Sequence, residues 1–169
     1  HNGKIMEILC IKKIICGNAQ IFTGCLGSLG FSILFHIRGR RLLIASLGGL
    51  ISWTVFLALG SLFPGESFRY FLASATVTVY AEVFARVIKT PTTTFLVPSL
   101  IPLIPGGSLY YTMNYALNEQ WSSFAAKALY TLELAAALAL GIIAVTTLVR
   151  LSTIAVRKLK KAEFFSHFH

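Results

Sequence analysis

Three prolines and a pair of glycines interrupt an apolar stretch, 95–117, that is long enough to cross a membrane. The interrupting residues are Pro98, Pro102, Pro105, Gly106 and Gly107. Each proline lacks an N–H group, and in a helix its ring clashes with the carbonyl four residues earlier. In lipid, unpaired backbone groups must be satisfied by protein, water or a ligand. The spacing therefore predicts a broken membrane helix, the fourth in the chain, whose free backbone groups could bind a transported substrate.

The second half of this segment carries polar side chains that could complete such a site. If it begins at Ser108, that serine could cap a short helix over 109–117, whose amides and positive dipole end would point toward the membrane midplane. Tyr110 and Tyr111 could line a polar path or mark the approach to the interface. The substrate-binding candidates are Pro102, Pro105, Gly106, Gly107, Ser108, Tyr110 and Tyr111. Alternatively, the prolines only kink a helix that its neighbours repair.

Three ionisable residues are candidates for proton coupling or for an ion pair. Glu82 precedes Arg86 by four residues, the order that favours an ion pair on one helical face. This pair is either functional, as ionisable residues within membrane spans often are, or a partly hydrated structural pair at the interface. Glu133 has no basic residue three or four positions away. Its partner must therefore come from another segment, unless the side chain is neutral and hydrogen-bonded.

Other reactive residue types form no recognisable site. Cys10, Cys16 and Cys25 are odd in number and lack the Cys-x-x-Cys spacing of redox or zinc sites. The four histidines lie at the chain ends or beside a charged loop, and there is no aspartate. No nucleophile stands beside a convincing base. We therefore expect no metal, no cofactor and no catalytic residue, and hence no enzyme.

The composition is that of a membrane protein. Hydrophobic residues make up 56% of the chain, charged residues only 12%, and the mean hydropathy is +0.74. The formal net charge of +9 does not indicate nucleic-acid binding, because the basic residues gather in short runs between apolar segments. Such runs are typical of membrane-flanking loops, with the bilayer and its anionic head groups as partner.

The apolar pattern predicts an all-α polytopic protein with one transmembrane domain over 1–169. The expected spans are about 14–35, 42–63, 68–88, 95–117 and 124–148, followed by a basic cytoplasmic tail at 150–169. Placing the loops at 38–41 and 86–89 on the cytoplasmic side with this tail collects ten of the fifteen Lys and Arg residues there. This predicts an external N-terminus and a cytoplasmic C-terminus, with Lys12 and Lys13 as exceptions.

Two quoted motifs carry a resemblance to a known family. The run ARVIKTPTTTFLVPSLIPLIPGGSLYYTM at 85–113 and the loop FHIRGRRLL at 35–43 resemble the threonine/serine exporter family. The chain is most similar to the short, five-helix half that is a separate subunit in many bacteria, over roughly 6–151. The family pattern has at its core the positions of Arg86, Pro91, Pro98, Pro102, Pro105, Gly106 and Tyr110. Glu82 fits the run YAEVFARVIKTP, whereas Glu133 belongs to no assigned pattern.

The resemblance implies a function, a partner and a location. Family members export threonine and serine, or in another branch a dicarboxylate such as succinate, driven by the proton gradient. The implied partner is the larger half of the exporter or further copies of this chain, in the bacterial inner membrane. The leading hypothesis is therefore a subunit of a secondary exporter that works by alternating access. A membrane scaffold that transports nothing and a passive channel are the alternatives.

Overall fold

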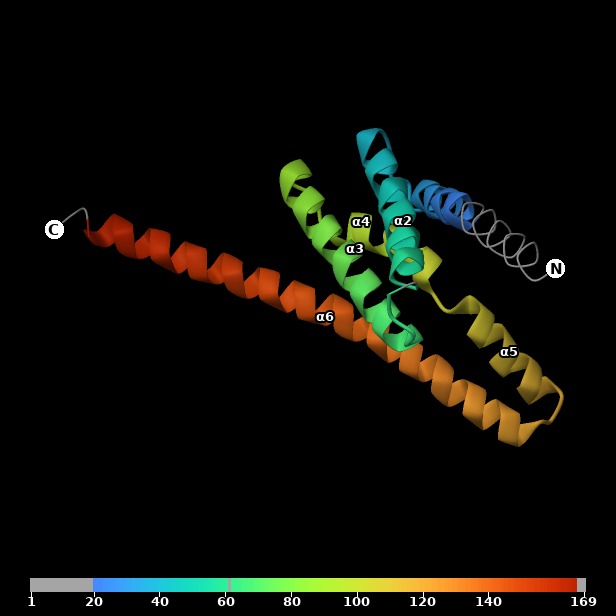
Figure 1. Cartoon of the computed structure of the whole chain (residues 1–169). Coiled ribbons are helices and arrows are strands. Elements are labelled where there is room, and N and C mark those ends of the chain that lie inside the picture. The colour runs from blue at the N-terminus through green and yellow to red at the C-terminus, as the bar shows by residue number, and fades with distance from the viewer. Residues whose placement is uncertain (1–19, 61, 167–169) are drawn as a thin grey trace, which may run out of the picture.

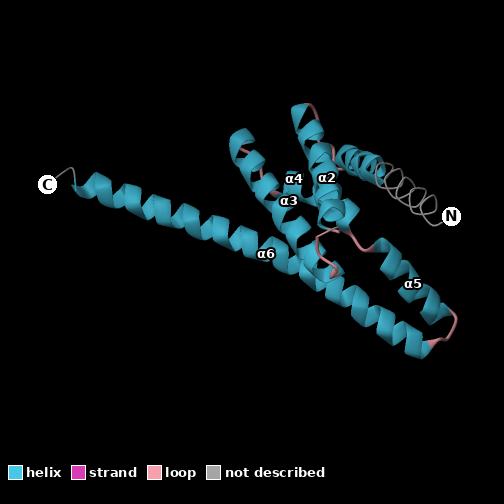
Figure 2. Ribbon diagram, in the orientation of Figure 1, coloured by secondary structure: helices cyan, strands magenta, loops and turns pink. Residues whose placement is uncertain are grey.

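In this computed structural model, residues 20–60 and 62–166 are described, and every regular element among them is a helix. The elements are a helix at Gln20–Leu34, α2 (Arg40–Leu59), α3 (Glu66–Ile88), α4 (Thr93–Leu100), the 3-10 helix η1 (Ile101–Leu103), α5 (Gly106–Leu117) and α6 (Trp121–Ser166). Figure 2 shows these helices joined by short connections. The predicted all-α class is confirmed.

The helices are those of a polytopic membrane protein. Among the described residues, three are long and apolar enough to cross a membrane, namely Arg40–Leu59, Glu66–Ile88 and Trp121–Ala155. The first predicted span, 14–35, lies partly outside the described residues, and its described part is the helix Gln20–Leu34. The fourth predicted span is broken into α4 with η1, and α5, as its prolines and glycines require.

Two helices differ in length from the predicted spans. The second span was predicted over about 42–63, and α2 ends at Leu59, with Pro64 in the connection to α3. The last span was predicted over about 124–148, and the helix α6 continues into the basic tail as far as Ser166. No proline or glycine follows Gly141, so nothing in the local sequence stops this helix.

Figure 1 shows that α2, α3, α4 and the helix at Gln20–Leu34 form one group, while α5 and α6 form a hairpin that extends away from it. The long helix α6 runs along α3 and then past its start, where α5 packs against it. The first half of the broken helix therefore lies within the group, and the second half lies outside it, against α6.

Three pairs of helices approach closely at glycines. At each glycine, a serine of the neighbouring helix fills the space that a side chain would occupy. A Cβ atom added at Gly49 would overlap the hydroxyl of Ser28, and one at Gly48 would overlap that of Ser99. A Cβ at Gly141 would likewise overlap the hydroxyl of Ser74. Gly48 and Gly49 thus allow α2 to lie close to α4 and to the helix at Gln20–Leu34.

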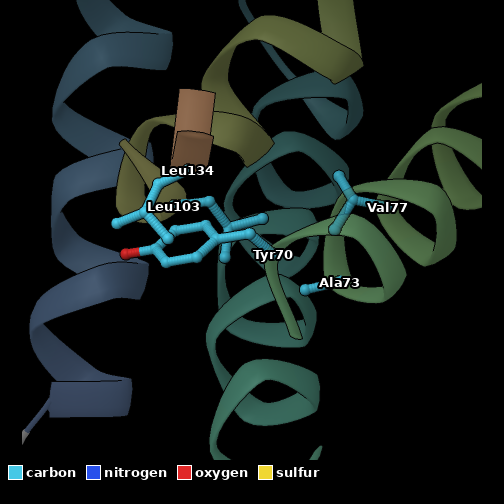
Figure 3. Close-up of a cluster of buried hydrophobic side chains, with 5 residues drawn as sticks. All are labelled: Tyr70, Ala73, Val77, Leu103 and Leu134. Carbon is cyan, nitrogen blue, oxygen red and sulfur yellow. The ribbon is translucent and has the colours of Figure 1, made fainter. Parts of the chain in front are cut away.

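Two buried clusters fix the first half of the broken helix. Leu103 of η1 packs with Tyr70, Ala73 and Val77 of α3 and with Leu134 of α6, as Figure 3 shows. Phe95 at the other end of this half packs with alanines of α2 and α3. Phe95 and Leu103 are both fully buried. In contrast, α5 has no buried residue.

Candidate functional site

The candidate site is the turn at which the broken helix changes direction. Ile104 is extended, with φ −63° and ψ 125°, and Pro105 follows with φ −73° and ψ 59°. The N–H of Gly106 donates to the carbonyl oxygen of Ile104 at 2.7 Å. These angles and this bond define an inverse γ-turn centred on Pro105. The turn ends η1 and directs α5 out toward α6.

Two of the three carbonyls that the prolines deprive of helical donors accept hydrogen bonds from other groups. Pro102 has no N–H to donate to the carbonyl of Pro98, and the hydroxyl of Ser28 donates to that oxygen instead, at 2.8 Å. Pro105 cannot donate to the carbonyl of Ile101, which accepts the N–H of Ile104 at 3.2 Å. On this side of the turn, repair by neighbours therefore occurs, as the alternative interpretation of the prolines proposed.

The amides on the other side of the turn are not all paired. Leu109 donates to the carbonyl of Pro105 at 3.1 Å, but the described residues provide no partner for the amides of Gly107 and Ser108. The expectation that Ser108 caps this helix was wrong, because α5 begins at Gly106 and Pro105 is its cap residue. Ser108 lies in the first turn of α5. The amides of Gly107 and Ser108 are therefore unpaired at the end of the helix that carries the positive dipole charge.

The predicted residues on α5 lie on an open surface. A Cβ at Gly106 or Gly107 would meet no described atom within 4 Å. Tyr110 and Tyr111 are 67% and 53% exposed, with their rings 5.6 Å apart in an edge-on arrangement. These residues therefore face away from the described core, where a ligand, water, lipid or neighbouring chain can reach them.

Pro102 instead lines a cavity of about 300 Å³. The other described lining residues are Ile101 of η1, Trp53 of α2, and Gln20, Thr23, Gly24 and Gly27 of the first helix. Trp53 stacks on Phe56 with ring centroids 5.3 Å apart. Its indole Nε1 is buried and has no hydrogen-bond partner among the described residues. Sequence reasoning did not identify this cavity.

The three ionisable candidates do not form one site. Glu82 and Arg86 lie 3.7 Å apart, and Arg86 also donates to the hydroxyl of Thr153 at 2.8 Å. Glu133 accepts a hydrogen bond of 2.6 Å from Ser67, at the opposite end of α3. Ser67 and Arg86 are about 28 Å apart along the helix, at about 1.5 Å per residue. The partner of Glu133 comes from another segment, as its sequence neighbourhood predicts.

Sequence reasoning missed the polar residues that surround Glu133. Glu66 accepts a hydrogen bond from Tyr130 and lies 3.4 Å from Arg69. The ammonium of Lys127 lies 4.7 Å from the centre of the Tyr130 ring. A signal existed in the i, i+3, i+6 spacing of Lys127, Tyr130 and Glu133. The sequence did not indicate that the start of α3 contacts this face of α6. Among the described residues, no group of three or more His, Cys, Asp or Glu side chains could hold a metal ion.

Comparison with known proteins gives one match. The sequence model of the family described as Threonine/Serine exporter, ThrE, matches residues 20–148, which is more than half of the chain. No curated protein and no solved structure matches it.

Proposed function

The chain belongs to the threonine/serine exporter family, and we propose that it is a subunit of a secondary-active, proton-coupled exporter of small polar metabolites. Threonine and serine are the proposed substrates, and a dicarboxylate such as succinate is the second candidate. The observation that carries the proposal is the turn at Pro105, which divides an apolar segment between a buried first half and an open second half. Such divided helices form binding sites in many transporters.

The substrate path follows the turn and the start of α5. The unpaired amides of Gly107 and Ser108 lie at the positive end of a helix, where a carboxylate is stabilised. Every proposed substrate carries a carboxylate. Tyr110 and Tyr111 add exposed hydroxyl groups on the same helix.

The same turn supplies a hinge for alternating access. Phe95 and Leu103 anchor the first half of the broken helix, whereas α5 buries no residue and packs mainly on α6. A change of the backbone angle ψ at Pro105 tilts α5 while α4 keeps its contacts with α2 and α3. Access to the path then alternates between the two sides of the membrane.

Proton coupling involves the polar contacts between α3 and α6. Protonation of Glu133 removes the charge that strengthens its hydrogen bond from Ser67, and this weakens the contact. Glu82 and Arg86 join the same two helices at the other end, through Thr153. Proton binding thus biases the relative position of α3 and α6.

The subunit works in the bacterial inner membrane with the larger half of the exporter or with copies of itself. We place its N-terminus outside and its C-terminus in the cytoplasm, because basic loops favour the cytoplasmic side. The exposed start of α5 is where a partner would complete the path.

Counterflow of labelled threonine, serine and succinate in proteoliposomes tests the proposal, with this chain alone and with its larger half. Gly106→Leu should abolish uptake, because its side chain enters the open space beside the free amides. Gly30→Leu is the matched control, since a Cβ there also meets no described atom within 4 Å, and it should retain uptake. A well-folded pair that is inert toward all three compounds, and is not stabilised by them, indicates a scaffold. Flux that does not change with the proton gradient indicates a channel.

A further inference from the structure

We propose that the cavity between Trp53 and Pro102 is a further substrate-binding pocket on the transport path, separate from the free amides of α5, and that it takes a short zwitterionic amino acid rather than a dicarboxylate. This inference rests on the proposed transport function and assigns residues and a substrate class to it. The pocket lies directly beside the broken helix, because Pro102 belongs to η1, just before the turn. None of the described residues that line it comes from α5.

The walls of the pocket are held in place by specific contacts. Ser28, one residue beyond Gly27, donates to the carbonyl of Pro98 and thereby fixes the first helix to the broken helix. The side chain of Ser28 also packs directly against the backbone of Gly49. Trp53, which also lines the pocket, stacks on Phe56. Phe56 in turn packs against Tyr70, with ring centroids 4.7 Å apart. The pocket is therefore preformed, as small-molecule sites usually are.

The position of the pocket along the helices is within the membrane. Trp53 is about 20 Å from the start of α2 at Arg40, at about 1.5 Å per residue. The lining residues of the first helix are spaced i, i+3, i+4 and i+7, on one face of that helix: Gln20, Thr23, Gly24 and Gly27. A transported molecule must pass this depth, so a pocket here can be loaded from one side and emptied to the other.

The chemistry of the lining favours an amino acid of zero net charge. The described lining includes the amide side chain of Gln20 and the hydroxyl of Thr23, and none of its described side chains is charged. A dicarboxylate would bring two negative charges into a low-dielectric site without a cation to offset them. The volume of about 300 Å³ lies at the small end of ligand pockets and suits a molecule of the size of threonine or serine.

A lipid chain is the competing occupant, because the described lining is mostly apolar. If lipid fills the pocket, threonine should produce no saturable change in the test below.

Trp53 makes the test direct, because the chain contains only two tryptophans and the other is Trp121. In Trp121→Phe, reconstituted as the full chain in phospholipid nanodiscs, the fluorescence of Trp53 reports what enters the pocket. L-threonine and L-serine should change it saturably, and succinate should not. Gly27→Leu in this background should weaken the threonine response by about tenfold or more, because its side chain enters the pocket.

Gly30→Leu is the matched control and should leave the response unchanged, since Gly30 is on the same helix with open space at its Cβ but does not line the pocket. Circular dichroism verifies the fold, and Gly27→Val is the smaller replacement if Gly27→Leu loses helicity.

Equal effects of the two glycine variants, an equal response to succinate, or no response to threonine would overturn the inference. If threonine counterflow persists without a Trp53 response, only the pocket assignment fails. If the response occurs without any counterflow, the pocket stands and the transport proposal fails.

Discussion

The hydroxyl of Ser28 donates a hydrogen bond of 2.8 Å to the carbonyl oxygen of Pro98, seventy residues away in the sequence. That oxygen has no helical donor, because the residue four positions later is Pro102. A single serine of the first helix thus replaces the backbone hydrogen bond that the broken helix lacks.

Ser28→Ala is expected to destabilise the protein, because it leaves the buried carbonyl of Pro98 unpaired. The expected loss is about 1–2 kcal/mol of unfolding free energy. Ser32→Ala is the control, since Ser32 is equally buried but donates only to the carbonyl of Ser28 in its own helix. Its effect should be below about 0.5 kcal/mol. Unfolding in mixed detergent micelles measures both, and equal losses would contradict the role given to Ser28.

Gly141→Ala is expected to separate α3 from α6. The added Cβ would overlap the hydroxyl of Ser74 and lie 2.6 Å from the carbonyl oxygen of Phe71, which is backbone and cannot rotate away. The expected cost is about 1–3 kcal/mol. Gly107→Ala, which meets no described atom within 4 Å, should be close to neutral. The same unfolding assay compares them, and a tolerated Gly141→Ala would show that the helices are packed less closely than described.

Glu133→Gln is expected to uncouple transport from protons while leaving exchange intact. The amide keeps the size of the side chain and can accept the hydrogen bond from Ser67, but it does not titrate. Counterflow of threonine should remain within about twofold of wild type, whereas uptake driven by an imposed pH gradient should fall about tenfold or more. Unchanged gradient-driven uptake would remove Glu133 from the coupling proposal.

Arg86→Gln is expected to impair transport more than stability. The guanidinium is 53% exposed and pairs with Glu82 at 3.7 Å, so the pair should contribute at most about 1 kcal/mol to stability. If Arg86 takes part in coupling, gradient-driven uptake should fall about tenfold. Thr153→Val, which removes only the hydroxyl that Arg86 contacts, should have a smaller effect on uptake. A loss of uptake that merely follows the loss of folded protein would assign Arg86 a structural role.

Features of the fold that depend on local chemistry could be predicted from the sequence. The break in the fourth segment follows from Pro98, Pro102 and Pro105, because the missing N–H groups belong to those residues alone. The all-α class follows from the long apolar runs between short basic loops. Both predictions depend only on residues that are neighbours in the sequence.

Features that depend on distant segments could not be predicted. The hydroxyl that pairs with Pro98 is one of several in the first helix, and only the packing selects Ser28 over Ser32. The sequence indicated that Glu133 needs a partner from another segment, but the partner is Ser67 because α6 runs past the start of α3. The capping role expected of Ser108 failed because the helix begins two residues earlier, at Gly106, which the γ-turn at Pro105 permits.

The uninterrupted length of α6 has a mechanical consequence. A close contact with α3, at Gly141, lies between the contact of Glu133 on one side and that of Thr153 on the other. A continuous helix is stiff over the roughly 30 Å that separate those two residues. In the proposed exporter, a tilt of α6 about Gly141 would therefore move its two ends in opposite directions. Opening at one face of the bilayer and closing at the other are then two ends of one movement.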